Sequence, residues 1–103
     1  MTPENQRIAI AEACGWYDLV KQDVSLFGKL EPESQKTFEL DVPDYLDDLN
    51  AMHEAEKTLG DPQLWEEYGD NLERAMGEVG WIYHATASQR AEAFLRTLNL
   101  WKP

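Results

Sequence analysis

The fold class is decided by residues 37–62, whose sequence is TFELDVPDYLDDLNAMHEAEKTLGDP. Apolar and polar side chains alternate through 37–42, which is the two-residue period of a strand with one buried face. Pro43 and Asp44 then open a helix that continues to about Leu59, because apolar residues recur there at helical spacing. A strand followed directly by a helix predicts an α+β domain.

The same kinds of signal place the other elements on either side of this stretch. They predict a helix capped by Thr2 and ended by a left-handed Gly15, a strand over 24–30, a helix from Asp61 to Gly77, a strand over 79–85, and a helix that begins with the capping box of Thr86 and Gln89. The residues after Gly15, including Trp16, are predicted as a connection. We therefore expect one domain over residues 1–103. It contains a small antiparallel sheet of about three strands packed by helices, in the order α-β-β-α-α-β-α.

The charge of the chain is concentrated in one third of its length. The 103 residues include 20 acids and 9 Lys or Arg, for a net charge of −11. Residues 39–73 contain twelve of the acids and one base, Lys57, and the rest of the chain is neutral. A nucleic acid needs a basic footprint, so direct nucleic-acid binding is not expected, whereas a basic protein surface is a suitable partner.

The sequence lacks the features of exported and membrane proteins. Its single cysteine, Cys14, excludes an intramolecular disulfide, and the N-terminus has no basic region followed by an apolar run. No stretch approaches the ~18 consecutive apolar residues of a membrane span. We therefore expect no membrane partner and a cytoplasmic location in a bacterium.

Six acidic residues on two predicted helices form the candidate binding surface: Asp47, Asp48, Glu66, Glu67, Asp70 and Glu73. In the first of these helices, Asp47, Asp48 and the neighbouring Asp44 lie in the first turn, where the helix dipole favours negative charge. In the second helix, three acids share one face at i, i+4 and i+7, a spacing at which like charges weaken a helix. A solvated helix face explains such residues most often. The alternative is an acidic surface that docks onto a basic groove or imitates a phosphate backbone.

The sequence contains no constellation for metal binding or catalysis. Cys14, His53 and His84 are the only thiol and imidazole ligands, and none of the spacings CxxC, HxxxH or HExxH occurs. His53 borders an apolar stripe, which favours a packed and hydrogen-bonded histidine. Cys14 lies on the apolar side of a helix, which favours an unreactive thiol. No nucleophile turn or glycine-rich phosphate loop is present and no carboxylate pair stands out, so we expect no enzyme, no metal and no cofactor.

A second constellation combines aromatic and polar residues: Trp16, Tyr45, Asn50 and Arg90. If the segments that carry them converge, they frame a small-molecule pocket in which Arg90 is available to an anionic group. The alternative is that Trp16 and Tyr45 are core aromatics and that Arg90 pairs with Glu92 or Glu12 at the surface.

Three segments of the chain, taken together, are similar to a known family. They are IAIAEACGW at 8–16, VPDYLDDLNAMHEAE at 42–56 and HATASQRAEAFLRTLNLW at 84–101, about 42 of the 103 residues. They resemble the phage ABA sandwich family of small phage and prophage proteins. The resemblance implies a sheet sandwiched by helices and a phage accessory protein, and it implies no enzymatic activity. One departure concerns the region between the first helix and the PDY motif, which is often longer and rich in tryptophan in that family and is compact and charged here.

These observations favour a phage-encoded accessory protein that inhibits a bacterial defence system. Such an anti-CRISPR or similar anti-defence protein would bind a host protein through its acidic helices in the cytoplasm of the infected bacterium. One alternative is a sponge that uses the pocket residues to sequester an immune signalling nucleotide. Another is a structural or regulatory phage adaptor without an immune role. A homo-oligomer stays open, because Trp101 suits both a place inside the monomer and one shared across a dimer.

Overall fold

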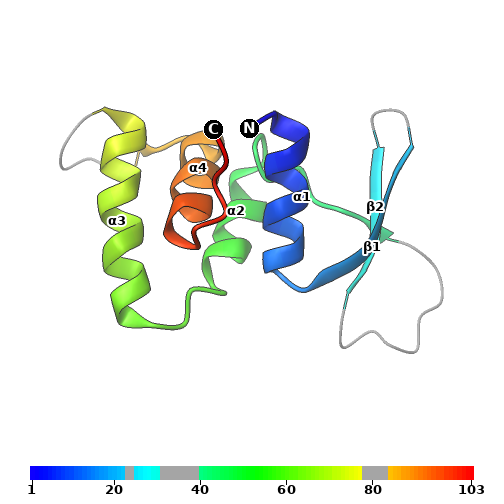
Figure 1. Cartoon of the computed structure of the whole chain (residues 1–103), viewed down its shortest axis with the longest axis horizontal. Helices are drawn as coiled ribbons and strands as arrows, with labels where there is room; N and C mark the ends of the chain where they lie inside the picture. The colour runs from blue at the N-terminus through cyan, green and yellow to red at the C-terminus, as the bar shows by residue number, and fades with distance from the viewer. Residues whose placement is uncertain (23–24, 31–39, 78–83) are drawn as a thin grey trace.

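The computed structural model describes residues 1–22, 25–30, 40–77 and 84–103 (Figure 1). Along these residues run α1 (Pro3–Ala13), β1 (Trp16–Gln22), β2 (Ser25–Leu30), β3 (Leu40–Asp41), α2 (Leu49–Glu56), α3 (Pro62–Met76) and α4 (Ala87–Thr97). The predicted class, a three-stranded antiparallel sheet combined with helices, is confirmed.

The sheet is a hairpin with a short third strand. β2 lies in the middle, antiparallel to β1 and to β3. β1 occupies residues that the sequence predicted as a connection, and a bulge explains the error. The register shifts between Tyr17 and Val20, and Asp18 has a φ of 53°. The extra residue interrupts the two-residue alternation, so the sequence of β1 has no clear strand period.

The strands predicted at 24–30 and 37–42 fall in the observed sheet. The first is β2, and the second contributes Leu40 and Asp41, which pair with β2 as β3. Residues 37–39 lie outside the described part of the chain. The strand that indicated the fold class is therefore present, as a short strand in the residues described.

The strand predicted at 79–85 falls mostly on residues that the structure does not describe. Residues 79–83 lie outside the described ranges, and His84 and Ala85 are not part of a strand. In the described residues the elements follow one another as α1, β1, β2, β3, α2, α3 and α4.

The predicted starts of α1, α3 and α4 and the predicted end of α3 are confirmed. The side chains of Thr2, Asp61 and Thr86 cap the three helices by accepting hydrogen bonds from backbone N–H groups of the first turn. Gln89 completes a capping box with Thr86. Gly77 ends α3 in the left-handed conformation, with a φ of 73°.

The start of α2 differs from the prediction. Asp48 is the N-cap, because its side chain accepts hydrogen bonds from the N–H groups of Asn50 and Ala51. Asp44 instead makes an isolated turn, in which its carbonyl accepts from the N–H groups of Asp47 and Asp48. The prediction that Asp44 and Asp47 lie in the first turn of the helix is therefore wrong.

A contact with α1 holds the segment that precedes the helix. The guanidinium group of Arg7 donates hydrogen bonds to the carbonyl groups of Val42 and Pro43, just before the turn. Tyr45 within the turn is buried in the core. Asp44, Asp47 and Asp48 are all able to cap a helix, and the local sequence does not indicate which of them does.

α4 is the central helix of the fold. Seven of its eleven residues are buried, and it packs against α1, α2 and α3. Phe94 and Leu95 are fully buried together with Ile10 of α1, Met52 of α2 and Leu72 of α3. Burial of each such side chain contributes about 1.5–3 kcal/mol. The core therefore lies mainly among the helices, and Trp16 of β1 and Leu26 of β2 extend it to the sheet.

α1 lies between the sheet and the other helices. Figure 1 shows the hairpin of β1 and β2 at one end of the molecule and α3 at the other, and all the described helices lie to one side of the hairpin. The molecule is accordingly elongated, with principal dimensions of 44 × 29 × 23 Å. This arrangement leaves one side of α3 on the core and the other side at the end of the molecule.

Candidate functional site

The outward side of α3 carries the largest group of predicted binding residues. We define the acidic face of α3 as Glu66, Glu67, Asp70 and Glu73. The first three are exposed and Glu73 is half-buried. On the inner side, Tyr68 and Leu72 are the fully buried residues among the fifteen of this helix. Most of the surface of α3 therefore faces solvent, and four carboxylates dominate it.

No cation of the described residues neutralises this face. The described ion pairs join other carboxylates: Lys21 with Glu4, Lys29 with Asp18, Lys57 with Glu54, Arg90 and His53 with Glu56, and Arg96 with Glu92. Arg74, the one base in the sequence of α3, donates to the side chain of Asn71 instead. Within the part of the chain that the structure describes, the charge of the acidic face is uncompensated.

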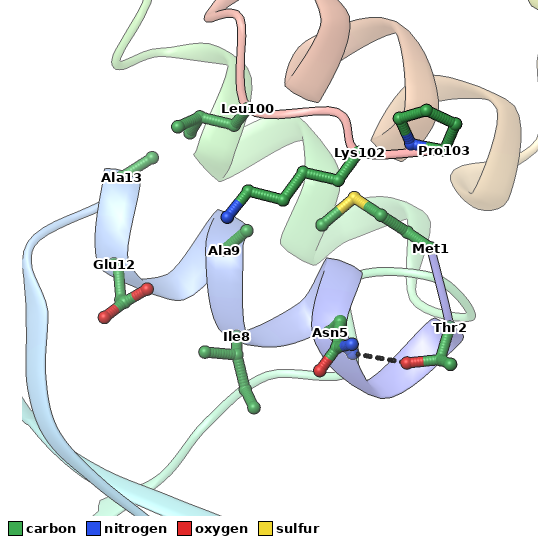
Figure 2. Close-up of a pocket in the computed structure, with 10 residues that line it drawn as sticks. All are labelled: Met1, Thr2, Asn5, Ile8, Ala9, Glu12, Ala13, Leu100, Lys102 and Pro103. Carbon is green, nitrogen blue, oxygen red and sulfur yellow. Dashed lines mark hydrogen bonds between the residues drawn. The ribbon is translucent and has the colours of Figure 1, made fainter.

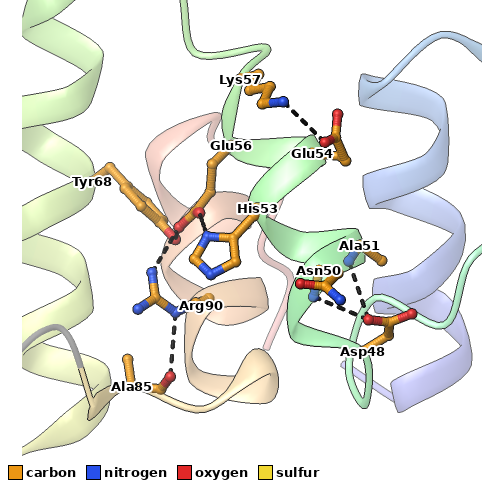
Figure 3. Close-up of polar contacts among 10 residues, drawn as sticks. All are labelled: Asp48, Asn50, Ala51, His53, Glu54, Glu56, Lys57, Tyr68, Ala85 and Arg90. Carbon is orange, nitrogen blue, oxygen red and sulfur yellow. Dashed lines mark hydrogen bonds and ion pairs between the residues drawn. The ribbon is translucent and has the colours of Figure 1, made fainter.

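Asp47 and Asp48 do not belong to this face. Asp48 caps α2, and Figure 3 shows it on the side of α2 that points away from α3. Asp47 lines a cavity of about 320 Å³, which is also lined by Arg7 of α1. The six predicted acids therefore form two separate groups, and the group on α3 is the one that shares a helix face.

A second charged group lies at the junction of α2, α3 and α4 (Figure 3), where Glu56, Tyr68 and Arg90 are buried and the half-exposed His53 lies at the edge. We define this buried charge cluster as His53, Glu56, Tyr68 and Arg90. One carboxylate oxygen of Glu56 accepts hydrogen bonds from Arg90 Nη1, at 3.0 Å, and from the Tyr68 hydroxyl. Its other oxygen lies 3.0 Å from Nδ1 of His53. Arg90 also donates from Nε to the carbonyl of Ala85 at 3.2 Å.

The buried charge cluster anchors α3 to the neighbouring helices. Glu56 is 5% exposed and Arg90 is 9% exposed, so each charge needs the other inside the protein. Burial, and then the hydrogen bond to Glu56, raises the pKa of the Tyr68 hydroxyl, which keeps its proton for that bond. Among the described residues, no buried side-chain nitrogen or oxygen lacks a partner. The cluster therefore ties α3 to α2 and α4.

This cluster was not predicted from the sequence, although a signal for it was present. Glu56 lies at helical spacing from Met52 and Leu59, so a carboxylate occupies the apolar side of α2. Arg90 lies at helical spacing from the buried Phe94 in the same way. A buried acid and a buried base must be paired, so two such residues on apolar helix faces predict a contact between their helices.

The four residues predicted to frame a pocket lie in three different places. Trp16 and Tyr45 come together, but both are buried in the core. Asn50 is exposed in the first turn of α2, and Arg90 belongs to the buried charge cluster. None of the four lines any of the three cavities that we describe. The geometry therefore lends no support to a nucleotide pocket built from these residues.

The expected surface pairing of Arg90 is wrong. Its carboxylate partner is the buried Glu56, at 3.0 Å, and not Glu92 or Glu12. Glu92 pairs with Arg96 of the same helix instead. Arg90 points into the junction of α2, α3 and α4, as its helical spacing from the buried Phe94 indicates.

Cys14 lies beside Tyr45, which in turn contacts Trp16. Burial raises the pKa of the Cys14 thiol, and a hydrogen bond with the Tyr45 side chain opposes this effect more weakly. Burial also raises the pKa of the Tyr45 hydroxyl. Because the thiolate is the nucleophilic form of cysteine, this environment works against nucleophilic chemistry at Cys14.

A groove of about 900 Å³ lies between α1 and the C-terminal segment (Figure 2). Its apolar lining includes Ile8, Ala9 and Leu100, and its charged lining consists of Glu12 and Lys102. Figure 2 shows the side chain of Lys102 stretched across the groove toward α1. A third cavity, of about 460 Å³, lies beside the C-terminal end of α4. None of the predicted binding residues lines either of these two cavities.

In the described residues, no group of three or more His, Cys, Asp or Glu side chains is arranged to hold a metal ion. No described helix has the length and apolar composition needed to cross a membrane.

No protein-family model, curated protein or solved structure matches this chain. What the protein binds must therefore be inferred from its own surface.

Proposed function

We propose that this chain is a binding protein without catalytic activity, and that the acidic face of α3 docks onto a basic surface of a partner protein. The uncompensated charge of that face is the observation that carries the proposal. Its four carboxylates have no ion pair within the described residues, whereas five Lys and Arg residues are paired with other acids. Like charges at this spacing weaken a helix, and a cationic partner relieves that repulsion.

The anchoring of α3 suits this role. Tyr68 and Leu72 hold the inner side of the helix in the core, and the Tyr68 hydroxyl is bonded to the buried Glu56. The acidic face is therefore presented by a helix that is already ordered. A surface that does not need to rearrange loses less conformational entropy on binding.

We further propose that the partner belongs to a bacterial defence system and that the protein acts in the cytoplasm of an infected bacterium. The resemblance of segments 8–16, 42–56 and 84–101 to the phage ABA sandwich family supports this proposal. Defence enzymes that act on nucleic acids need basic surfaces for the phosphate backbone, and an acidic protein face competes for such a surface.

A phage plating assay tests this proposal in bacteria that carry restriction or CRISPR systems. Expression of the protein should restore plating of a targeted phage against one of these systems. The combined changes Glu66→Lys, Asp70→Lys and Glu73→Lys should abolish the restoration. The matched control, Glu12→Lys with Asp41→Lys and Asp44→Lys, alters three exposed acids elsewhere and changes the net charge equally, so it should retain activity.

The controls separate the outcomes. If both triple variants remain active, the acidic face is not the binding surface. If both lose activity, total charge rather than position matters, which also contradicts the proposal. The adaptor alternative predicts that no variant affects plating at all. Once the partner is identified, its affinity for the protein should fall steeply as ionic strength rises, because exposed charges are screened by salt.

A further inference from the structure

We propose that the acidic face of α3 receives an arginine side chain of the partner protein in a notch centred on Gly69. This inference rests on the proposed function of that face. We define the Gly69 notch as Gly69 with Trp65, Glu66 and Glu73. Residues three and four apart are neighbours on a helix surface, so one indole and two carboxylates surround a position that has no side chain.

The fold itself does not require a glycine at position 69. Gly15 and Gly77 have positive φ angles and Gly69 does not. A Cβ atom at Gly28 would lie 2.5 Å from Leu19, whereas one at Gly69 would meet nothing within 4 Å. Glycine weakens a helix interior relative to alanine. A bare position inside a helix, with open space above it, allows a ligand side chain to approach the backbone closely.

Trp65 forms the aromatic wall of the notch. It is 45% exposed, although indole is the largest apolar side chain. Its ring meets Tyr68 edge to face, with centroids 5.7 Å apart and an interplanar angle of 83°. Tyr68 is in turn bonded to the buried Glu56. The exposed indole is therefore positioned by the buried charge cluster, as expected of an aromatic anchor in a protein interface.

Elsewhere in the same chain, an indole and a carboxylate together bind the guanidinium group of an arginine. The guanidinium carbon of Arg96 lies 4.9 Å from the centroid of the Trp101 ring. Arg96 Nε also donates to the carboxylate of Glu92 at 3.0 Å. This group lies within the monomer, where Trp101 packs against the core. The Gly69 notch combines the same residue types, one indole and two carboxylates, at helical spacing.

The guanidinium group is the component that the notch lacks within the described residues. Arg74, the arginine of α3, is engaged with Asn71. A guanidinium is planar, stacks on an indole and presents several N–H donors to carboxylates, whereas the ammonium of lysine is a compact point charge. The notch therefore selects arginine over lysine.

Two peptides of equal charge test this selectivity on the full chain. Fluorescein-labelled hexa-arginine and hexa-lysine are titrated against the protein at low salt, with fluorescence anisotropy as the readout. The wild type should bind hexa-arginine about two- to fivefold more tightly than hexa-lysine, the size of one exposed cation–π contact.

Two substitutions should remove the preference and leave hexa-lysine binding in place. Gly69→Leu fills the notch and strengthens the helix, and Trp65→Leu removes the aromatic wall. Gly60→Leu is the matched control: a Cβ there also meets nothing within 4 Å, and the residue lies outside α3. A melting temperature of Gly69→Leu at or above that of the wild type shows that lost selectivity does not come from unfolding.

The outcomes distinguish the notch from the acidic face as a whole. Equal affinity of the wild type for the two peptides overturns the proposal that the notch receives arginine. It does not contradict the proposed function of the acidic face. A preference for arginine that survives both Trp65→Leu and Gly69→Leu overturns the proposal for the notch as well. Hexa-lysine binding that persists after Lys reversal of Glu66, Asp70 and Glu73 contradicts the proposed function itself.

Discussion

The buried charge cluster and the acidic face lie on opposite sides of α3. They differ in whether their charged groups are paired within the described residues. In the cluster, Glu56 is 5% exposed and is bonded to Arg90, Tyr68 and His53. In the acidic face, four carboxylates are without an ion pair among the described residues, and three of them are exposed. Tyr68 ties the helix to the cluster, while Glu66, Glu67 and Asp70 nearby in sequence face solvent. The contrast separates the charge that holds the fold together from the charge that is available to a partner.

Removal of one member of the buried pair should have the largest effect on the free energy of unfolding. Arg90→Met leaves the carboxylate of Glu56 buried without its cation, and we expect a destabilisation of about 3–5 kcal/mol. Urea denaturation followed by circular dichroism measures the change. The matched variant Arg96→Met removes the exposed pair with Glu92 and should cost about 1 kcal/mol or less. Similar losses in the two variants would show that burial does not distinguish these ion pairs.

Alkaline pH should lower the stability of the folded protein through Tyr68 on the inner side of α3. Burial raises the pKa of this tyrosine, with a further contribution from Glu56. A tyrosine in the unfolded chain ionises near pH 10, so above that pH the unfolded state loses a proton that the folded state keeps. The stability is therefore complete below about pH 10, and it falls above it by about 1.4 kcal/mol per pH unit for one such tyrosine.

Tyr68→Phe tests this pH dependence. Urea midpoints between pH 8 and 12 should decline less steeply in this variant than in the wild type. Tyr45, whose pKa is also raised by burial, contributes its own part of the slope and remains in the variant. An unchanged slope would mean that Tyr68 does not hold its proton in the folded state.

Gly69→Ala should stabilise the protein by about 1 kcal/mol, because alanine favours a helix interior and its Cβ finds open space. Gly28→Ala should have the opposite sign, since its Cβ would lie 2.5 Å from Leu19 and 3.2 Å from Trp16. Calorimetric melting temperatures of the two variants measure the difference. A lower melting temperature for Gly69→Ala would reveal a packing role that the structure does not show.

Neutralisation of the acidic face should have the smallest effect on stability. Glu66→Gln, Asp70→Asn and Glu73→Gln together should change the free energy of unfolding by about 0.5 kcal/mol or less, as for other surface changes. The expected direction is stabilising, because like charges at i and i+4 repel. A loss above about 1 kcal/mol in urea denaturation would assign these acids a role in the fold and weaken the contrast with the cluster.

Features that depend on neighbouring residues were predicted from the sequence. The caps of α1, α3 and α4 are local, because Thr2, Asp61 and Thr86 bond to N–H groups within the next turn. The shared face of Glu66, Asp70 and Glu73 also follows from helical spacing alone. Both could therefore be inferred before the helices were placed in space.

Features that depend on distant contacts were missed. The segment before α2 is held by Arg7, which lies 35 positions away from Val42 in the chain. The bulge in β1 removes the period on which strand prediction depends, and its register with β2 is visible only in the sheet. Arg90 finds Glu56 across 34 positions. The acids of α3 were identified, but the absence of an ion pair to them among the described residues is visible only in the folded chain.

The separation of the two sides of α3 has a consequence for protein engineering. Gln63, Glu66, Glu67, Asp70 and Arg74 are all exposed on a helix whose buried contacts come from other positions. A combinatorial library that randomises these five positions samples new binding specificities without altering the core. The chain thus offers a small helical scaffold, with a single free thiol at Cys14, in which recognition is diversified by display selection while the melting temperature stays nearly constant.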